Sequence, residues 1–424
     1  MKILNSQSLT LLLFIIPLSF IVGIAVTEFF VFFCTILFLI INKDKSLFFD
    51  KKIIFLFLFS AYILINAYFK ISDDLKLGSI FYFRYVLFSL AIFYFCKLFD
   101  DSKNKKYFFL LISFLLILII DSLFQFFYGF NTLGFKIIAG GDRVSSFFND
   151  ELILGSFLVR FMPVILWFIF FLKIDLKKNI ISIITFFSLY FITIYLSGGR
   201  TSFFLSVVII LGLFIIIKDL RRILSYSIII LIFFIFITSY FKIGSTNTFN
   251  RIFLKTYNQI TKNEININKS DTKIKKELKK FNIYSEEHEG HILLALNLFE
   301  KNKIFGIGPK GFKDYCRKVK YVPKIGICST HPHNILIQII LELGLIGLVF
   351  YIVAAIFVLF NFFKSIVRHK FNYDYLAFYS ITLGLIINLF PLIPGGNFFN
   401  NWISIILYYN IGLYLYSYKK CILK

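Results

Sequence analysis

Long apolar runs, separated by short polar and basic segments, repeat along almost the whole chain. Most runs have the length of a helix that crosses a lipid bilayer. They predict an all-α polytopic membrane protein with twelve transmembrane helices. The predicted spans are residues 9–25, 27–42, 52–69, 77–98, 107–128, 151–172, 179–196, 201–217, 222–241, 333–363, 374–393 and 399–418. The first run lacks a small-residue cleavage site, so we interpret it as a retained anchor.

One long polar segment, about residues 242–332, interrupts this pattern. It divides the chain into nine N-terminal helices (1–241), a large loop (242–332) and three C-terminal helices (333–424). Residues 261–289 are rich in Lys, Asn and Glu, which predicts a solvated, mobile excursion. From Gly290 to Phe299 an amphipathic pattern returns, which predicts a helix lying against the membrane surface.

Composition and charge support the membrane class and give an orientation. Of the 424 residues, 58% are hydrophobic, and the formal net charge is +23. An even number of spans places both termini on one side, where 21 Lys and Arg residues lie, against five in the short loops opposite. The positive-inside rule therefore predicts cytoplasmic termini and a long loop outside the cytoplasm. The excess charge then fits anionic headgroups and an anionic substrate, and we expect no nucleic-acid partner.

Three arginines are predicted to lie near the outer boundary of the membrane. Arg143 follows a Gly-Gly-Asp sequence, Arg200 ends a tight turn that starts at Ser197, and Arg251 follows the ninth helix. A guanidinium fork and a helix N-terminus both bind phosphate groups well. We therefore predict a site for the anionic group of a lipid-linked substrate. The alternative for Arg200 is a contact with lipid phosphate.

Two further arginines, Arg84 and Arg160, lie inside predicted spans, where a charge is costly without a partner or a polar cavity. Either one is a structural ion-pair member or faces such a cavity, and the sequence does not decide between these roles. Asp121 and Gln125, one helical turn apart, are candidate partners for one of them.

The junction between the loop and the tenth helix carries a dense group of candidate residues, namely His331, Pro332, His333 and Asn334, and Glu342 follows on the helix. Imidazoles exchange protons near neutral pH, so this group is a candidate for proton transfer to a substrate held by lipid. The alternative is that both histidines only cap the polar end of a transmembrane helix.

Cys316 and Cys328 both lie in the loop, in a compartment that permits disulfides, and we predict a bond between them. No cofactor is expected, because the G-x-G-x-x-G sequence at residues 306–311 has no βαβ context. No metal site is expected either, because His288 and His291 lack the spacing of the H-E-x-x-H motif.

The order of these motifs resembles the O-antigen ligase and O-antigen polymerase superfamily of bacterial envelope glycosyltransferases. Its ligases carry His, then Asn, Ser or Gln, nine residues, and Gly-x-x-Gly. This chain matches that motif with His333, Asn334, Gly344 and Gly347.

Two further positions match the superfamily. A turn of small residues ending in Arg is matched by Ser197 to Arg200, and an Arg at the start of the large periplasmic loop is matched by Arg251. One position departs from it: where the family often has Arg before the Gly-x-Gly turn, this chain has His291.

The resemblance implies a glycosyltransferase of the bacterial inner (cytoplasmic) membrane with a periplasmic active site. The donor would be a glycan on undecaprenyl diphosphate, and the acceptor lipid A–core or another glycan. Arg200, Arg251 and Arg143 would bind the diphosphate without a metal, and His333 would act as general base in one inverting displacement. The supporting residues would be Asn334, His331, His291, Ser197 and Glu342.

Other functions fit the same residues. A polymerase would use a second carrier-linked repeat unit as its acceptor, and the motifs separate it poorly from a ligase. A transporter or flippase would use the arginines for binding only, although it should carry more charge along a path through the membrane. A membrane scaffold would leave the histidine and arginine groups unexplained.

Overall fold

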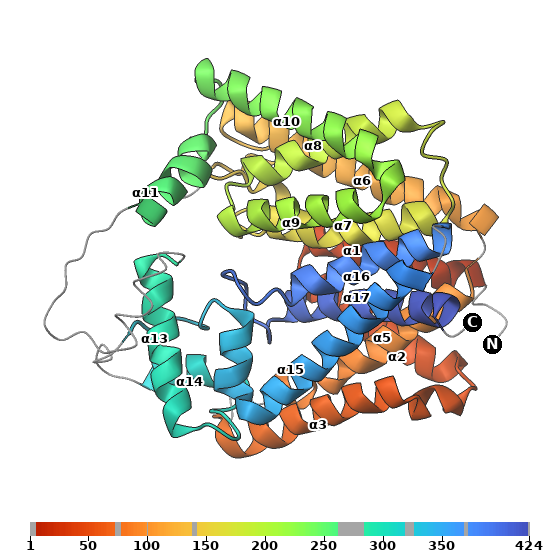
Figure 1. Ribbon diagram of the computed structural model, residues 1–424, viewed down its shortest axis with the longest axis vertical. Helices are drawn as coiled ribbons and strands as arrows, with labels where there is room; N and C mark the ends of the chain where they lie inside the picture. Colours follow the sequence, from red (N-terminus) through yellow and green to blue (C-terminus); the bar gives the residue numbers. More distant parts are fainter. Residues whose placement is uncertain are drawn as a thin grey trace, which may run out of the picture.

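The computed structural model describes residues 6–72, 78–99, 101–137, 142–261, 284–318, 326–368 and 372–422. This part of the chain is helical and contains no strand; one isolated β-bridge joins Phe130 and Lys136. The long helices lie side by side in a bundle, and short helices gather beyond one end of it (Figure 1). The long helices are α1 (Ser6–Val22), α2 (Ile24–Ile41), α3 (Lys51–Lys70), α5 (Phe83–Lys97), α6 (Asp101–Tyr128), α7 (Leu154–Phe171), α8 (Ile180–Leu196), α9 (Arg200–Ile216), α10 (Arg221–Tyr240), α15 (Ile335–Arg368), α16 (Tyr373–Asn388) and α17 (Asn401–Cys421).

Each predicted span coincides with one of these helices, with its ends shifted by a few residues. Within the described residues, seven segments are long and apolar enough to cross a membrane. These are Ile24–Ile41, Lys51–Lys70, Gly78–Lys97, Lys105–Tyr128, Leu154–Phe171, Lys218–Tyr240 and Ile335–Val367. Together they identify a multi-pass membrane protein; the count of twelve spans and the orientation stay predictions.

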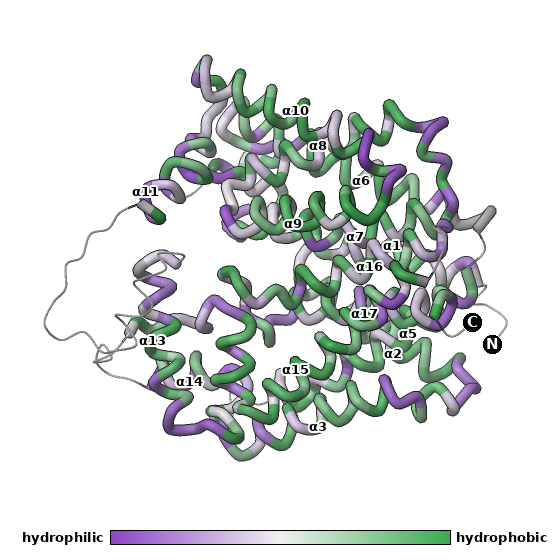
Figure 2. The backbone as a smooth tube through the Cα atoms, viewed as in Figure 1, coloured by the Kyte–Doolittle hydropathy of each residue, from purple (hydrophilic) through white to green (hydrophobic). Residues whose placement is uncertain are grey.

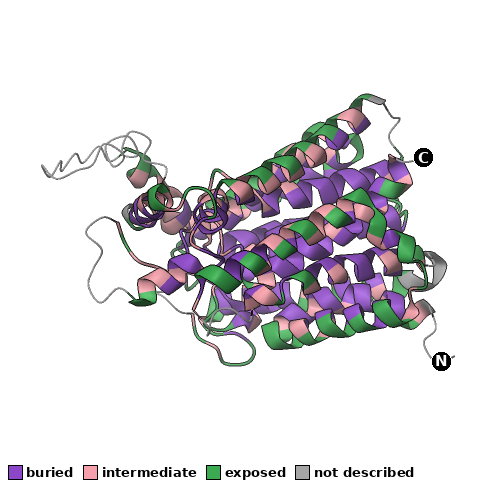
Figure 3. Ribbon diagram, turned by 90° about the horizontal axis from the view of Figure 1, so that it is seen from below, coloured by how far each residue is buried: buried purple, intermediate pink, exposed green. Residues whose placement is uncertain are grey.

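The distribution of apolar side chains is that of a helical bundle in lipid. Hydrophobic residues run along the full length of the helices, and hydrophilic residues collect towards both ends of the bundle (Figure 2). The buried residues fill the interior, while the outer helix faces are exposed (Figure 3). On those outer faces large apolar side chains such as Phe29, Ile120 and Phe233 are about 60% exposed, which is the expected environment for lipid contact.

Helix α7 forms the centre of the bundle and is buried over nearly its whole length. It packs against α16, and α17 packs against α5. Trp167 of α7 is fully buried, and its indole nitrogen donates to the Ser417 hydroxyl of α17 at 2.7 Å. Helix α7 also packs against α8 and α9, and α16 packs against α15.

The two intramembrane arginines have partners other than the predicted ones. Arg84 of α5 forms an ion pair with Glu28 of α2, with 3.0 Å between Nη2 and Oε1, while Arg160 of α7 donates to the Ser156 hydroxyl and lies over the ring of Trp402. The interpretation that Asp121 or Gln125 pairs with one of them is therefore wrong.

Asp121 and Gln125 of α6 instead fix the loop that follows their own helix. The Asp121 carboxylate accepts from the Thr132 amide at 2.8 Å. The Gln125 side-chain oxygen accepts from the Ser145 and Ser146 amides at 3.0 and 2.7 Å. These bonds hold the chain just after Arg143 against the bundle.

The large loop contains several short elements: η4 (Asn250–Leu254, a π-helix), α11 (Lys255–Thr261), α13 (Glu286–Lys301) and α14 (Gly311–Lys318). Residues 262–283, most of the predicted solvated excursion, lie outside the described part of the chain. The amphipathic pattern does form a helix, α13, but its apolar face packs on α14 and α15. Leu294, Ala295 and Leu298 contact Phe312 and Leu341 there. A disulfide joins Cys316 and Cys328, with 5.5 Å between their Cα atoms.

Candidate functional site

The turn between α8 and α9 is shaped by a glycine. Gly198 has φ +62°, a left-handed conformation that favours glycine. A Cβ atom at this position would lie 2.6 Å from the Asp142 carbonyl oxygen, 2.9 Å from Arg143 Cγ and 3.2 Å from Arg251 Cδ. The turn therefore lies directly between two of the predicted arginines, and only glycine leaves room for both.

Both arginines are fastened to the carbonyl groups of this turn. Arg251 Nε donates to the Gly198 carbonyl at 2.9 Å, and Arg143 Nε donates to the Ser197 carbonyl at 3.1 Å. Arg143 also donates through Nη2 to the Leu152 carbonyl at 2.8 Å. Burial and the positive charge of Arg251 lower the pKa of Arg143 to about 10. Arg143 thus mainly holds the turn in place through these hydrogen bonds, and it adds a positive charge beside Arg251.

Arg200 is the first residue of α9, and its Nη1 donates to the Gln259 side-chain oxygen at 2.8 Å. The positive end of the α9 dipole adds to its charge. Asp142 is the acidic residue of this group: its carboxylate lies 4.0 Å from Arg251 and 3.2 Å from Lys255. Three arginines and one lysine against a single carboxylate form a net cationic site, which we call the arginine turn.

Four histidines form a second group, the histidine cluster. His288 and His291 come from α13, while His331 and His333 come from the loop before α15. The ring centroids of His331 and His333 are 3.9 Å apart, and those of His288 and His291 each lie 5.0 Å from His333. His333 is therefore the central member.

The hydrogen bonds of His331 leave it no nitrogen for proton transfer. Its Nε2 lies 3.3 Å from the Gly395 carbonyl, and its Nδ1 lies 2.9 Å from the Thr330 hydroxyl. Because a carbonyl only accepts, Nε2 must donate, and Nδ1 then accepts from the hydroxyl. His331 is an anchor for the loop that follows α16.

His333 is held in an unusual backbone conformation, with φ +57°. The Gly395 amide donates to its carbonyl at 2.7 Å and fixes this geometry. Its Nε2 lies 3.1 Å from the Ser329 hydroxyl, a group of the kind that a sugar acceptor would bring. His333 thus has a strained backbone, a position fixed by Gly395, and a ring nitrogen in contact with a hydroxyl.

The cluster is neutral at pH 7. Burial, reinforced by the neighbouring histidines, lowers the pKa of His333 to about 3. Burial lowers the pKa of His331 to about 4, and the pKa values of His288 and His291 are also below the ordinary value. Neutral imidazoles can accept a proton, which is what a general base requires.

Arg200 of the arginine turn lies close enough to His288 of the histidine cluster for its charge to act on the imidazole. After burial and the neighbouring His291, the positive charge of Arg200 is a further cause of the lowered pKa of His288. Arg200 is about 90 residues before His288 and about 130 before His333 in the chain. The fold therefore brings a cationic site next to neutral imidazoles.

Asn334 fixes the start of α15. Its side-chain oxygen accepts from the Ile337 amide at 3.0 Å, so it acts as a helix cap. Its side-chain nitrogen donates to the Pro391 carbonyl at 2.8 Å and to the Tyr284 hydroxyl at 3.2 Å. Asn334 therefore links three segments around His333.

Glu342 lies away from the imidazoles and is fully buried. Its carboxylate accepts from Gln338 Nε2 at 2.9 Å and from the Phe312 amide at 3.1 Å. Gln338 also donates to Asn397 at 2.8 Å. Glu342 supports the site from a distance, because it joins α14 to α15.

Helix α15 is broken at Gly344, where φ is +66° and ψ is −163°. The broken helix leaves its own backbone groups unpaired, and residues 303–308 supply the partners. The Ile307 and Gly308 amides donate to the Leu341 and Glu342 carbonyls, at 3.0 and 2.9 Å. In return, the Leu345 amide donates to the Lys303 carbonyl at 2.9 Å. Irregular backbone inside a membrane protein needs such partners.

Comparison with protein families gives a match for residues 185–352, to the family described as O-antigen ligase. The match contains the arginine turn from Ser197 to Arg200, Arg251, His333 and the break at Gly344. It supports the predicted resemblance to the O-antigen ligase superfamily. Comparisons with curated proteins and with solved structures find no match.

Two contributors to the site were not predicted from the sequence. His288 joins the histidine cluster, although the spacing argument considered it only as a metal ligand. Gly395 anchors both His331 and His333, in the segment between α16 and α17. The clue in the sequence was the combination of two prolines, two glycines and Asn397 between apolar helices.

His291, which stands where the superfamily often has an arginine, lies in the histidine cluster. His291 stacks against His333 and carries a buried Nδ1 with no hydrogen-bond partner in the described part of the chain. Within the same residues, no group of three or more His, Cys, Asp or Glu side chains is arranged to hold a metal ion. The rings of His288, His291 and His331 each lie within 5.0 Å of the His333 ring, centroid to centroid.

Proposed function

We propose that this chain is a membrane glycosyltransferase of the O-antigen ligase type. It would move a glycan from a polyprenyl diphosphate, of the undecaprenyl class, to an acceptor hydroxyl. The observation that carries the proposal is the approach of the arginine turn to the histidine cluster. The membership in the superfamily supports lipid-linked glycans as the substrate class.

The donor diphosphate binds at the arginine turn, where Arg200 and Arg251 face it and the α9 dipole contributes. The acceptor hydroxyl takes the place of the Ser329 hydroxyl against His333. Its oxygen attacks the anomeric carbon as the bond from that carbon to the phosphate oxygen breaks. The diphosphate leaves with the electron pair, and the proton passes to His333. The product has inverted configuration.

The bound diphosphate of the donor also raises the basicity of His333. A pKa near 3 makes a weak base at neutral pH, but a nearby negative charge raises the pKa of an imidazole. Donor binding next to the cluster therefore increases the basicity of His333 when it is needed. The arginines stabilise the negative charge on the leaving diphosphate, so we expect chelators to leave the rate unchanged.

The test is transfer by the purified protein, with carrier-linked glycan as donor and lipid A–core as acceptor. His333→Asn is the informative variant, because Asn tolerates the left-handed backbone that Ala would strain. We expect His333→Asn to abolish transfer at normal protein levels. His331→Asn should retain part of the activity, since His331 only anchors the loop.

The product identifies the acceptor class. Glycan on lipid A–core supports ligation, and lengthened carrier-linked glycan means that the protein is a polymerase. Full activity of His333→Asn would contradict the assignment of the base. Movement of the donor across vesicles without any transfer product would mean a transporter.

A further inference from the structure

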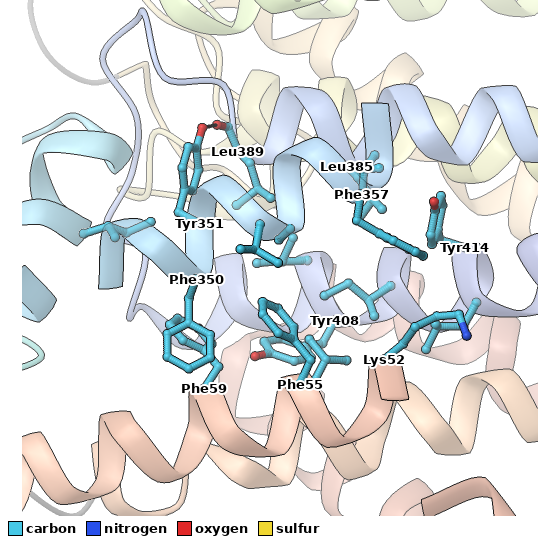
Figure 4. Close-up of a pocket in the computed structure, with 18 of the residues that line it drawn as sticks. Lys52, Phe55, Phe59, Phe350, Tyr351, Phe357, Leu385, Leu389, Tyr408 and Tyr414 are labelled. Carbon is cyan, nitrogen blue, oxygen red and sulfur yellow. Dashed lines mark hydrogen bonds between the residues drawn. The ribbon is translucent and has the colours of Figure 1, made fainter. Parts of the chain in front are cut away.

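An apolar cavity of about 350 Å³ lies between α3, α15, α16 and α17 (Figure 4). This volume lies within the range of pockets that bind small molecules. Its aromatic walls include Phe55 and Phe59 of α3 and Phe357 of α15. No arginine or histidine of the functional site lines it, so the proposed glycan transfer does not account for this space.

The cavity begins where direct contact between α3 and α15 ends. The Phe350 ring lies 5.3 Å from the rings of both Phe55 and Phe59, and these contacts join the two helices. Beyond Phe350, towards Lys52, α15 presents the half-buried Ala354 and Phe357 to the hollow. Val353 on its rim is 46% exposed. A groove with half-exposed apolar walls, in a protein surrounded by lipid, is open to hydrocarbon chains.

One end of the cavity is basic. Lys51 and Lys52 line it there, and an adjoining hollow of about 130 Å³ is lined by Lys52, Lys419 and Asp50. Among the described residues that line either hollow, Asp50 is the single acidic one, and it pairs with Lys52 at 2.9 Å. The lysine rim, defined as Lys51, Lys52 and Lys419, thus keeps a net positive charge.

We propose that the cavity holds an acyl chain of an anionic glycerophospholipid whose phosphate lies at the lysine rim. The apolar walls match the hydrocarbon chain, and the rim matches the charge of the headgroup. Basic pockets between membrane helices on the cytoplasmic side bind anionic headgroups in this way. The rim lies on the side that we infer to be cytoplasmic.

The position of the rim distinguishes this lipid from the glycan donor. Helix α3 begins at the rim and ends at the opposite end of the bundle, where Gly308 of the loop packs against Lys70. The arginine turn is at that same opposite end, near α11 and α13 (Figure 1). A donor held by its diphosphate at the arginine turn cannot also place that group on the lysine rim. The bound phospholipid would instead fill the space between α3 and α15, the helix that begins next to the histidine cluster.

The experiment measures lipid bound to the purified full-length protein by native mass spectrometry, with phosphatidylglycerol or phosphatidylcholine added in detergent. Wild-type protein should retain phosphatidylglycerol in preference to phosphatidylcholine. Lys51→Gln should weaken retention about fivefold, the effect expected for one lysine near a phosphate. Ala354→Phe fills the cavity and should abolish retention.

Each variant has a matched control. Ile356→Phe adds the same ring to α15 at a 61% exposed position outside the cavity. Lys45→Gln removes the charge of an exposed lysine that lines neither hollow. Both controls should bind as wild type does. Equal retention of the two phospholipids, or unchanged binding in Lys51→Gln, would overturn the proposal, as would displacement of phosphatidylglycerol by polyprenyl phosphate. Because Lys51 is exposed, we expect Lys51→Gln to fold, and its lipid retention tests the proposal even if Ala354→Phe fails to fold.

Discussion

Replacing Arg251 with lysine separates the geometry of the arginine turn from its charge. In the structure, Nε of Arg251 is bound to the Gly198 carbonyl at 2.9 Å, and Nη1 lies 4.0 Å from the Asp142 carboxylate. In the proposed reaction, the anchored Nε directs the outer fork of the guanidinium so that its two N–H groups would bind the diphosphate together. Lysine keeps the positive charge but loses both the anchor and the fork.

The expected loss follows from these contacts. Removing one preorganised donor to a developing negative charge costs about 2.7–4 kcal/mol of transition-state stabilisation, or about a hundred- to a thousandfold in rate. We therefore expect kcat/KM of Arg251→Lys to fall by that factor in the transfer assay, with the protein still inserted and folded. Substrate binding should weaken less, because the net charge of the site is unchanged.

Lys255 offers a matched control. It lies 3.2 Å from the same carboxylate of Asp142, and its side chain is 60% exposed. Lys255→Gln removes a full charge from the group without touching the arginine fork. We expect it to lower the rate less than about fivefold, as is typical of an exposed ion pair. If the site responds to net charge alone, Lys255→Gln will lower the transfer rate more than Arg251→Lys does. That result would refute the reasoning, and so would a rate of Arg251→Lys within threefold of the wild-type rate.

Four further predictions concern the two residue groups and the loop beside them. Gly198→Ala forces a left-handed backbone and a contact with the Asp142 carbonyl, so thermal unfolding should show a loss of at least about 1–3 kcal/mol together with slow transfer. Because the folded pKa of His333 is about 3, the acid limb of kcat/KM should lie well below pH 6.5, and the limb of kcat should lie at higher pH once the donor anion is bound. For the same reason stability should fall as pH drops below 6.5, since the unfolded chain binds the proton more tightly. Replacing Cys316 and Cys328 by serine should lower stability by about 3 kcal/mol, and thiol labelling of the unreduced wild type should leave both cysteines unmodified.

The positions of the long helices were predictable because each depends on a local property, the length of an apolar run. The break in α15 was not, although its glycine is visible in the sequence. The pattern predicts one continuous span over 333–363, since a helix interrupted at Gly344 and an unbroken one have the same hydrophobic period. What allows the break is the backbone of residues 303–308, and no periodicity indicates which distant segment will supply those groups.

In the candidate site, too, some residues were predictable from the sequence and others were not. Residue type was enough to single out Arg251 and His333, which the structure places in the arginine turn and in the histidine cluster. The addition of His288 to the cluster depends on how α13 packs against α15, which the sequence does not show. The partner of Arg84 was also unpredictable from the sequence. Glu28 is 56 residues away, and only the packing of α2 on α5 brings the two side chains together.

The exchange of backbone bonds at Gly344 has a consequence for the biosynthesis of the protein. The ribosome makes residues 303–308 before it makes 341–346, so the amides and carbonyls of the first segment have no partners until the second arrives. In the same way, the Leu341 and Glu342 carbonyls of α15 gain their partners only from residues 307 and 308, which were made earlier. Chains that end before residue 341 would therefore lack half of this junction, and quality-control proteases should degrade them together with the loop that carries the histidines.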